Sequence, residues 1–156
     1  MPSPLPILIA LTIAAGPLRA EFLHVEQSVA GLDCASCAQS VDKTLKKIKG
    51  VETASFRMQD SVAVLQLKPG NTTPLEEVRD AVKRIGYTPK DAKVTVRGEA
   101  RREGEKWVFR VAGSAAEYPL EVSAGQGIAG GVLIIEGVIA ADRGAPLKVG
   151  SVRRGE

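Results

Sequence analysis

The sequence predicts an α+β protein, and three patterns along its 156 residues support this class. Runs that alternate apolar and polar residues indicate strands with one buried face. Two stretches with apolar residues three and four positions apart indicate amphipathic helices. The helical patterns end before residue 91, whereas 92–156 holds strand patterns separated by glycine-rich and charged turns. The chain is therefore expected to have a mixed first part and an all-β second part.

The first part has the element order βαββαβ, which predicts a ferredoxin-like fold. The strand patterns cover 22–29, 51–58, 62–67 and an extended segment from Tyr87. Ser36 is the expected N-cap of the first helix, which we expect to end at Gly50. Thr73 and Gly86 are expected to bound the second helix. The buried stripes predict a core formed by Leu23, Val41, Phe56 and Val82. The polar face of the first helix is expected to be exposed to water and carries Asp42, Lys43, Lys46, Lys47 and Lys49.

The second part shows five short strand patterns, which predict a small, OB-like barrel. They cover 94–96, 107–111, 120–122, 132–138 and 147–152, and 98–104 is an expected turn. Trp107, Phe109 and Val111 share one strand face and are expected in the core. Few aromatic residues and nearly balanced charges argue against a nucleic-acid surface. We expect a structural or partner-docking domain.

Charge and motifs exclude several classes of function. The formal net charge is only +3, which is too small to favour nucleic acid or an anionic membrane. The chain has neither a Ser/His/Asp set nor a glycine-rich phosphate loop, so neither hydrolase nor nucleotide chemistry is indicated. The sequence predicts a protein that is not an enzyme.

The first twenty residues have the pattern of a secretory signal peptide. The apolar run 5–15 is shorter than the roughly 20 residues of a membrane-spanning helix. Gly16 and Pro17 follow it, and Ala20 is the expected cleavage position. The predicted divisions are a signal peptide at 1–20 and domains at 21–91 and 92–156, in a periplasmic or secreted protein. An uncleaved anchor is the alternative, and this segment is then the only contact with a membrane.

The two cysteines of the chain, Cys34 and Cys37, lie between the first strand pattern and the first helix pattern. Two thiols at this spacing converge when one lies on a loop and the other on the first turn of a helix. The helix N-terminus favours thiolate, and two thiolates are natural ligands for a soft cation. Outside the cytoplasm the pair can also persist as a disulfide, so both states remain open.

The run from Gly31 to Cys37, the order of elements and the Gly86-Tyr87 pair together resemble the heavy-metal-associated domain, over about Glu21 to Asp91. The resemblance implies that Cys34 and Cys37 bind a soft metal ion, Cu(I), Zn(II) or Hg(II). It implies a metallochaperone or scavenger whose partner is a metal transporter or another CXXC protein. The Gly86-Tyr87 loop is expected beside the metal. Leu32 replaces the family's commoner methionine and fills a similar volume.

Asp33 is the position that bears on which metal is bound. An aspartate before the first cysteine resembles the amino-terminal domains of zinc, cadmium and lead pumps, in which it can join the metal. Zn(II) seeks four ligands and accepts carboxylate oxygen, whereas two sulfurs satisfy Cu(I). The alternative is an exposed turn residue. His24 and Met58 are expected on the sheet and not at the metal.

Two other functions compete with metal transfer. A thiol–disulfide redox protein also places CXXC at a helix start. Against it, Asp33 replaces the usual aromatic residue, no proline separates the thiols and the domain is short. A third possibility is a domain that docks a membrane protein and senses metal.

Overall fold

The computed structural model describes residues 21–111 and 114–155. The predicted signal peptide and its cleavage after Ala20 lie outside these residues. Within the described part of the chain, no helix has both the length and the apolar character needed to cross a membrane.

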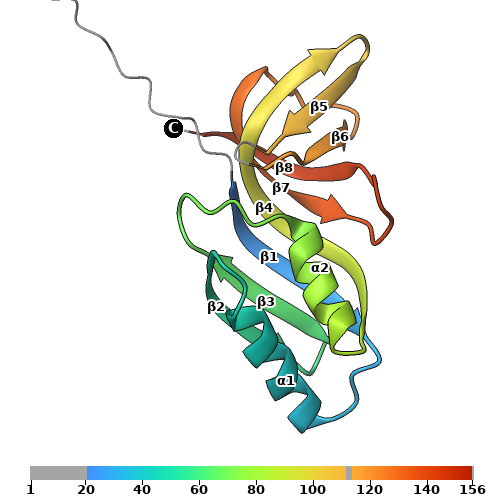
Figure 1. The fold of residues 1–156 in the computed structure, drawn as a ribbon. Helices are drawn as coiled ribbons and strands as arrows, with labels where there is room; N and C mark the ends of the chain where they lie inside the picture. Colours follow the sequence, from blue (N-terminus) through green and yellow to red (C-terminus); the bar gives the residue numbers. More distant parts are fainter. Residues whose placement is uncertain (1–20, 112–113, 156) are drawn as a thin grey trace, which may run out of the picture.

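The first part is an antiparallel sheet with two helices on one face (Figure 1). Its elements are β1 (Glu21–Ala30), α1 (Ala35–Lys46), β2 (Val51–Arg57), β3 (Val62–Leu67), α2 (Leu75–Arg84) and β4 (Thr88–Glu103). The strand order is β2-β3-β1-β4, and every pair is antiparallel. The predicted α+β class and the βαββαβ order are therefore confirmed.

The ends of α1 differ from the prediction. The N-cap is Cys34, which has extended backbone angles (φ −134°, ψ 146°), and Ser36 already lies in the first turn. The sulfur of Cys34 accepts the backbone N–H of Cys37, so it fills the role expected of the Ser36 hydroxyl. The helix ends at Lys46, earlier than the expected stop at Gly50.

The start of α2 also differs. The helix begins at Leu75 with Pro74 as its N-cap, and no side chain caps it. Thr73, the predicted N-cap, donates its hydroxyl to the carbonyl oxygen of Lys49 at 2.6 Å. This contact joins the loop before α2 to the segment after α1.

The core of the first part follows the prediction in the helices and departs from it in β1. Val41 and Val82 are fully buried, and Phe56 is half-buried. Phe22 is buried in β1, whereas Leu23 is only half-buried. The reason is a shift in the β1–β4 register between Phe22 and His24, which changes the alternation of faces.

The second part is all-β, as predicted, and its strands pair in a closed ring. The added strands are β5 (Lys106–Arg110), β6 (Glu117–Glu121), β7 (Gly131–Ile139) and β8 (Leu147–Arg154). The ring runs β4-β5-β6-β8-β7 and returns to β4 through the β4–β7 pairing. The β6–β8 pair is parallel and the others are antiparallel.

β4 belongs to both parts and is much longer than predicted. It spans 16 residues, and it pairs with β1 as well as with β5 and β7. The predicted turn 98–104 therefore lies mostly in a strand. Gly98 is needed there because a Cβ atom would lie 2.6 Å from two ring carbons of Phe109. The predicted domain boundary after Asp91 falls within β4 and stays a prediction.

The two parts also pack against each other. The rings of Phe22 in β1 and Tyr118 in β6 meet edge to face, with centroids 6.4 Å apart. Arg79 of α2 is only 4% exposed and donates to the carbonyl oxygens of Ile139 at 3.0 Å and Ala140 at 2.8 Å. A buried guanidinium with these acceptors fixes α2 to the end of β7.

Candidate metal centre

The candidate centre lies in the loop between β1 and α1. Gly31 follows the last residue of β1 with φ +89°, a conformation that glycine adopts without strain. Leu32 is 6% exposed and belongs to the core, so it anchors the loop as expected for a residue that replaces methionine. Asp33 to Cys37 then lead from the loop into the helix.

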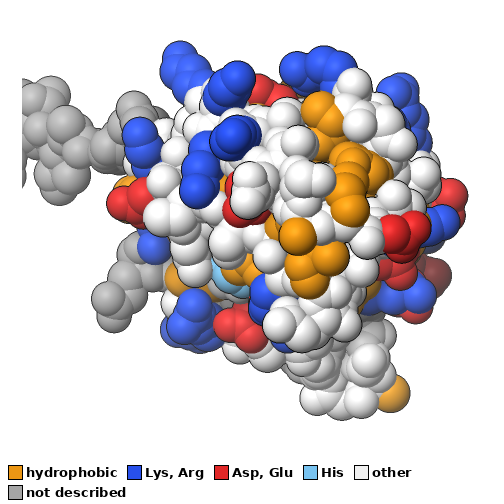
Figure 2. All heavy atoms as spheres, turned by 90° about the horizontal axis from the view of Figure 1, so that it is seen from below, with side chains coloured by type: hydrophobic (Ala, Val, Ile, Leu, Met, Phe, Trp, Pro, Cys, Tyr) orange, Lys and Arg blue, Asp and Glu red, His pale blue; other side chains and the backbone are white. Residues whose placement is uncertain are grey.

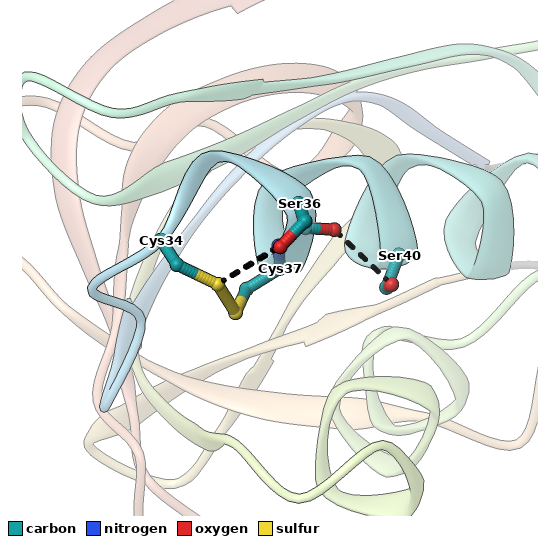
Figure 3. The surroundings of a disulfide bond; sticks show 4 residues. All are labelled: Cys34, Ser36, Cys37 and Ser40. Carbon is teal, nitrogen blue, oxygen red and sulfur yellow. Dashed lines mark hydrogen bonds between the residues drawn. A yellow bond between two sulfur atoms is a disulfide. The ribbon is translucent and has the colours of Figure 1, made fainter.

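The structure brings Cys34 and Cys37 together, as the spacing predicts. The two residues are joined by a disulfide, with Cα atoms 5.2 Å apart (Figure 3). Both are half-buried. Of the two states left open by the sequence, the structure therefore shows the oxidised one.

Two donors point to the sulfur of Cys34 (Figure 3). The backbone N–H of Cys37 donates to it at 3.2 Å, and the hydroxyl of Ser36 lies 3.3 Å away. Donors at a helix N-terminus stabilise negative charge on sulfur. The sequence analysis attributed this effect to the helix N-terminus and missed the hydroxyl of Ser36. The available signal was a serine between the two cysteines.

Asp33 is exposed at the start of the loop. Across residues 21–111 and 114–155, no group of three or more His, Cys, Asp and Glu side chains is placed to hold a metal ion. The structure thus joins the two sulfurs without adding the carboxylate of Asp33, whose role as a ligand stays a prediction.

The Gly86-Tyr87 pair lies beside the cysteine loop, as the resemblance implies. A Cβ atom on Gly31 would lie 3.9 Å from Cδ1 of Tyr87, which places the ring against the end of β1. The backbone N–H of Tyr87 donates to the carbonyl oxygen of Val82, and its half-buried ring packs on the core. Tyr87 therefore connects the end of α2 to the loop that carries the cysteines.

Two other residues, His24 and Met58, have side chains that can bind metal. His24 is in the middle of β1, with Nε2 3.5 Å from Oε1 of Glu26. Met58 follows β2 and is 40% exposed. His24 agrees with the expectation of a sheet position, whereas Met58 lies in the turn after β2, which ends one residue earlier than predicted.

Residues 27–88 match the family model of the heavy-metal-associated domain. This part of the chain is a heavy-metal-associated domain. The match contains both cysteines, α1, α2 and the Gly86-Tyr87 pair.

Relatives with this domain are named as copper transporters. The chain is 34% identical over 79 residues to a probable copper-transporting ATPase, PacS, of Synechocystis, and 30% identical over 60 residues to human copper-transporting ATPase 2. These matches cover 51% and 38% of this chain but only 10% and 4% of the two relatives. A solved amino-terminal domain of a potential copper-translocating ATPase from Bacillus subtilis is 26% identical, with a TM-score of 0.41, and the match covers 44% of this chain and 85% of that one.

Proposed function

We propose that this protein is an exported, non-catalytic metal carrier in which Cys34 and Cys37 bind one soft metal ion and pass it on. The observation that supports this most is the convergence of both sulfurs at the N-terminus of α1, inside a heavy-metal-associated domain. The implied partner is a metal transporter or another CXXC protein. The metal ion is cargo and not a resident cofactor.

The chemistry begins with reduction of the disulfide. Two small-molecule thiols, or one dithiol, donate two electrons and two protons to the S–S bond and become a disulfide, which leaves thiols on Cys34 and Cys37. Metal binding then releases their protons, since thiolate is the ligand form. Because both cysteines are only half-buried, an incoming thiolate pair can replace them one at a time. Such exchange suits a carrier better than a store.

Cu(I) is the first candidate cargo. Two sulfurs satisfy Cu(I), and the relatives are named as copper transporters. Zn(II) remains the competing candidate because Asp33 lies next to Cys34 in the sequence and zinc accepts a carboxylate oxygen. Hg(II) is a third candidate, since it also accepts two sulfurs.

Native mass spectrometry of the reduced chain tests the proposal. The protein is equilibrated in turn with Cu(I), Zn(II) and Hg(II), and a matched sample is first oxidised to the disulfide. We expect one metal ion per reduced chain and none on the oxidised chain. Equal metal retention by the two samples would place the metal away from the cysteines.

The disulfide itself favours one alternative, a thiol–disulfide redox protein. Such a protein transfers its disulfide rapidly to other dithiols, with a low-pKa attacking cysteine. The rate of exchange with a reduced model peptide separates the two functions. A metal carrier is expected to exchange no faster than an ordinary surface disulfide, whereas a rate far above that value would favour the redox function.

Export is the part of the proposal that rests on residues 1–20. The short apolar run and the small residue Ala20 support cleavage there and a periplasmic or secreted location. Amino-terminal sequencing of protein from expressing cells is expected to find Glu21 first. Soluble cytoplasmic protein that begins at Met1 or Pro2 would refute export.

We propose that the second part is an OB-like barrel. Its role is structural or partner-docking, and it binds no nucleic acid. The closed ring β4-β5-β6-β8-β7, with one parallel pair, supports this assignment. Arg101 and Arg110 both contact Glu117, so two cations of this part already have a carboxylate partner. A filter-binding assay with single-stranded DNA and RNA is expected to give no saturable binding.

A further inference from the structure

We propose that Gln27 is a positioning residue for the metal site, and that the barrel slows metal release through it. Gln27 lies in β1, and its side chain contacts β4 and α2. Arg79 of α2 connects the same group of residues to the end of β7. The inference rests on the proposed function and gives the second part of the chain a role in it.

Two neighbouring strands hold the loops at the metal end of the molecule. Ala30, the last residue of β1, pairs with Thr88, the first residue of β4. The cysteine loop follows Ala30 and Tyr87 precedes Thr88, so the pair brings both loops to one end of the molecule (Figure 1). The ring of Tyr87 lies against Gly31 there, because a Cβ atom on Gly31 would be 3.9 Å from Cδ1 of the ring. The position of the ring therefore depends on the start of β4.

The start of β4 contains a bulge that Gln27 fixes. The β1–β4 register shifts between Gln27 and Val29, so that Ser28 alone faces two residues of β4, at positions 90 and 91. The side chain of Gln27 is fully buried and donates to the carbonyl oxygens of Lys90 at 2.7 Å and Ser28 at 2.9 Å. It thereby supplies the bulge with a hydrogen-bond donor that the disrupted ladder lacks. Lys90 is only three residues after Tyr87.

The barrel holds the same bulge through two contacts. Oε1 of Gln27 accepts the Nε–H of Arg79 at 3.4 Å, and this buried guanidinium also donates to the carbonyl oxygens of residues 139 and 140. The next residue, Ala141, donates its backbone N–H to Oδ1 of Asp91 at 3.1 Å. Both residues of the bulge are therefore connected to the end of β7, one through Gln27 and Arg79 and the other directly.

Metal release requires motion at this end of the molecule, because an incoming thiolate must reach sulfurs that are only half-exposed. Tyr87 is half-buried as well, and Figure 2 shows this end, where hydrophobic side chains reach the surface among charged and polar ones. A ring that packs on one side and meets solvent on the other moves outward when its strand is loosened, since local opening becomes easier as contacts are lost. By fixing the bulge, Gln27 keeps the ring on Gly31 and opposes opening of the cysteine loop.

Asp91 offers a mild variant and a conservative one. Asp91→Ala removes the acceptor of the Ala141 N–H, whereas Asp91→Asn keeps an oxygen that can accept it. Asp91 is exposed, so neither change disturbs the core. Lys90→Ala is the matched control at the neighbouring exposed position, because Lys90 contacts Gln27 through its backbone.

Gln27→Met is the stronger variant. Methionine has a similar length but no amide, so both the bulge and Arg79 lose a partner. The change also lowers stability, since buried polar groups are left without hydrogen bonds. Gly98→Ala is the control for this effect, because its added Cβ meets the ring of Phe109 further along β4 and leaves the bulge unchanged.

The first measurement needs no metal. In the oxidised chain, the nuclear Overhauser effect between the ring protons of Tyr87 and the α-protons of Gly31 reports whether the ring is in place. We expect wild-type strength in D91N, K90A and G98A, a weaker effect in D91A and its loss in Q27M.

The second measurement is the rate at which the reduced, Cu(I)-loaded chain loses its metal to an excess of a Cu(I) chelator. We expect release about threefold faster in D91A and about tenfold faster in Q27M, since lost hydrogen bonds make local opening easier by factors of this order. Release from D91N, K90A and G98A should stay within about 1.5-fold of wild type.

The outcomes separate this inference from the function on which it rests. If wild type takes up no Cu(I), the proposed function fails and the inference about release fails with it. If wild type binds Cu(I) but the Overhauser effect is unchanged in D91A and Q27M, only the inference is overturned. Unchanged release despite a weaker Overhauser effect would overturn it as well. So would release from G98A as fast as from Q27M, because lost stability would then explain the rate.

Discussion

At the residue scale, the two cysteines are not equivalent. Cys34 is the N-cap of α1 and accepts the N–H of Cys37, whereas Cys37 lies within the first helical turn. Sequence spacing was sufficient to predict the pair, because CXXC at a helix start allows few geometries. It was not sufficient to predict which cysteine caps the helix. The pattern favoured Ser36 as the cap, whereas the extended backbone of Cys34 places the cap two residues earlier.

Asp33 provides a test of metal choice at this scale. If its carboxylate completes a thiolate site for Zn(II), Asp33→Ala should weaken Zn(II) affinity about tenfold or more, since loss of one ligand oxygen costs on the order of 1–3 kcal/mol. Cu(I) affinity should change little because two sulfurs already satisfy it. Competition titrations with chelators measure both. Equal, small changes for the two metals would show that Asp33 is a turn residue.

Arg79 is a residue whose importance the sequence did not reveal. A helix pattern places it among charged neighbours, yet it is 4% exposed and contacts Ile139 and Ala140 from the other part of the chain. Arg79→Met should lower the free energy of unfolding by about 2–4 kcal/mol, because buried carbonyl oxygens lose their donor. Urea denaturation measures this. Lys83→Met, an exposed control on the same helix, should change the value by less than about 0.5 kcal/mol.

At the element scale, helices and short strands were predictable, and the long strand was not. Apolar spacing located α1, α2, β2 and β3 because local periodicity reports which face is buried. The full length of β4 was not predicted because Gly98 and the charged residues after it are typical of a turn. The strand continues there because β5 and β7 supply partners from distant parts of the chain. Strand pairings between residues far apart in the sequence leave no local pattern in the sequence itself.

Gly98 tests the packing of β4. Alanine is normally preferred to glycine in a strand, by roughly 0.5–1 kcal/mol. Here the added Cβ meets the ring of Phe109, so Gly98→Ala should instead lower the free energy of unfolding by about 1–3 kcal/mol. Glu99→Ala, at the exposed neighbouring position, is the control and should have little effect. A Gly98→Ala protein as stable as wild type would show that both the Phe109 ring and the Arg110 carbonyl oxygen, which lies 2.5 Å from the added Cβ, can move aside.

At the scale of the whole molecule, the two parts share one strand and one core. Buried residues from β1, α1 and α2 join those of β5, β7 and β8 in a single cluster. Composition and pattern indicated two units, since helices occur in only one of them. Their connection through β4, Arg79 and the Phe22–Tyr118 contact depends on tertiary packing.

This connection predicts cooperative unfolding. Trp107 is the only tryptophan and reports on the second part, whereas the helical circular dichroism signal of the described residues comes from the first part. Urea transitions followed by tryptophan fluorescence and by far-ultraviolet circular dichroism should therefore have the same midpoint. Two separate midpoints would mean that the parts unfold independently.

The central claim is that Cys34 and Cys37 form the metal site. The most direct test is a titration of the reduced chain with Cu(I) against a competing chelator, in wild type and in the C34S/C37S variant. The account predicts one tightly bound Cu(I) per wild-type chain and a loss of affinity of several orders of magnitude in the variant, with an unchanged circular dichroism spectrum. Wild-type Cu(I) retention by a folded C34S/C37S protein would contradict it.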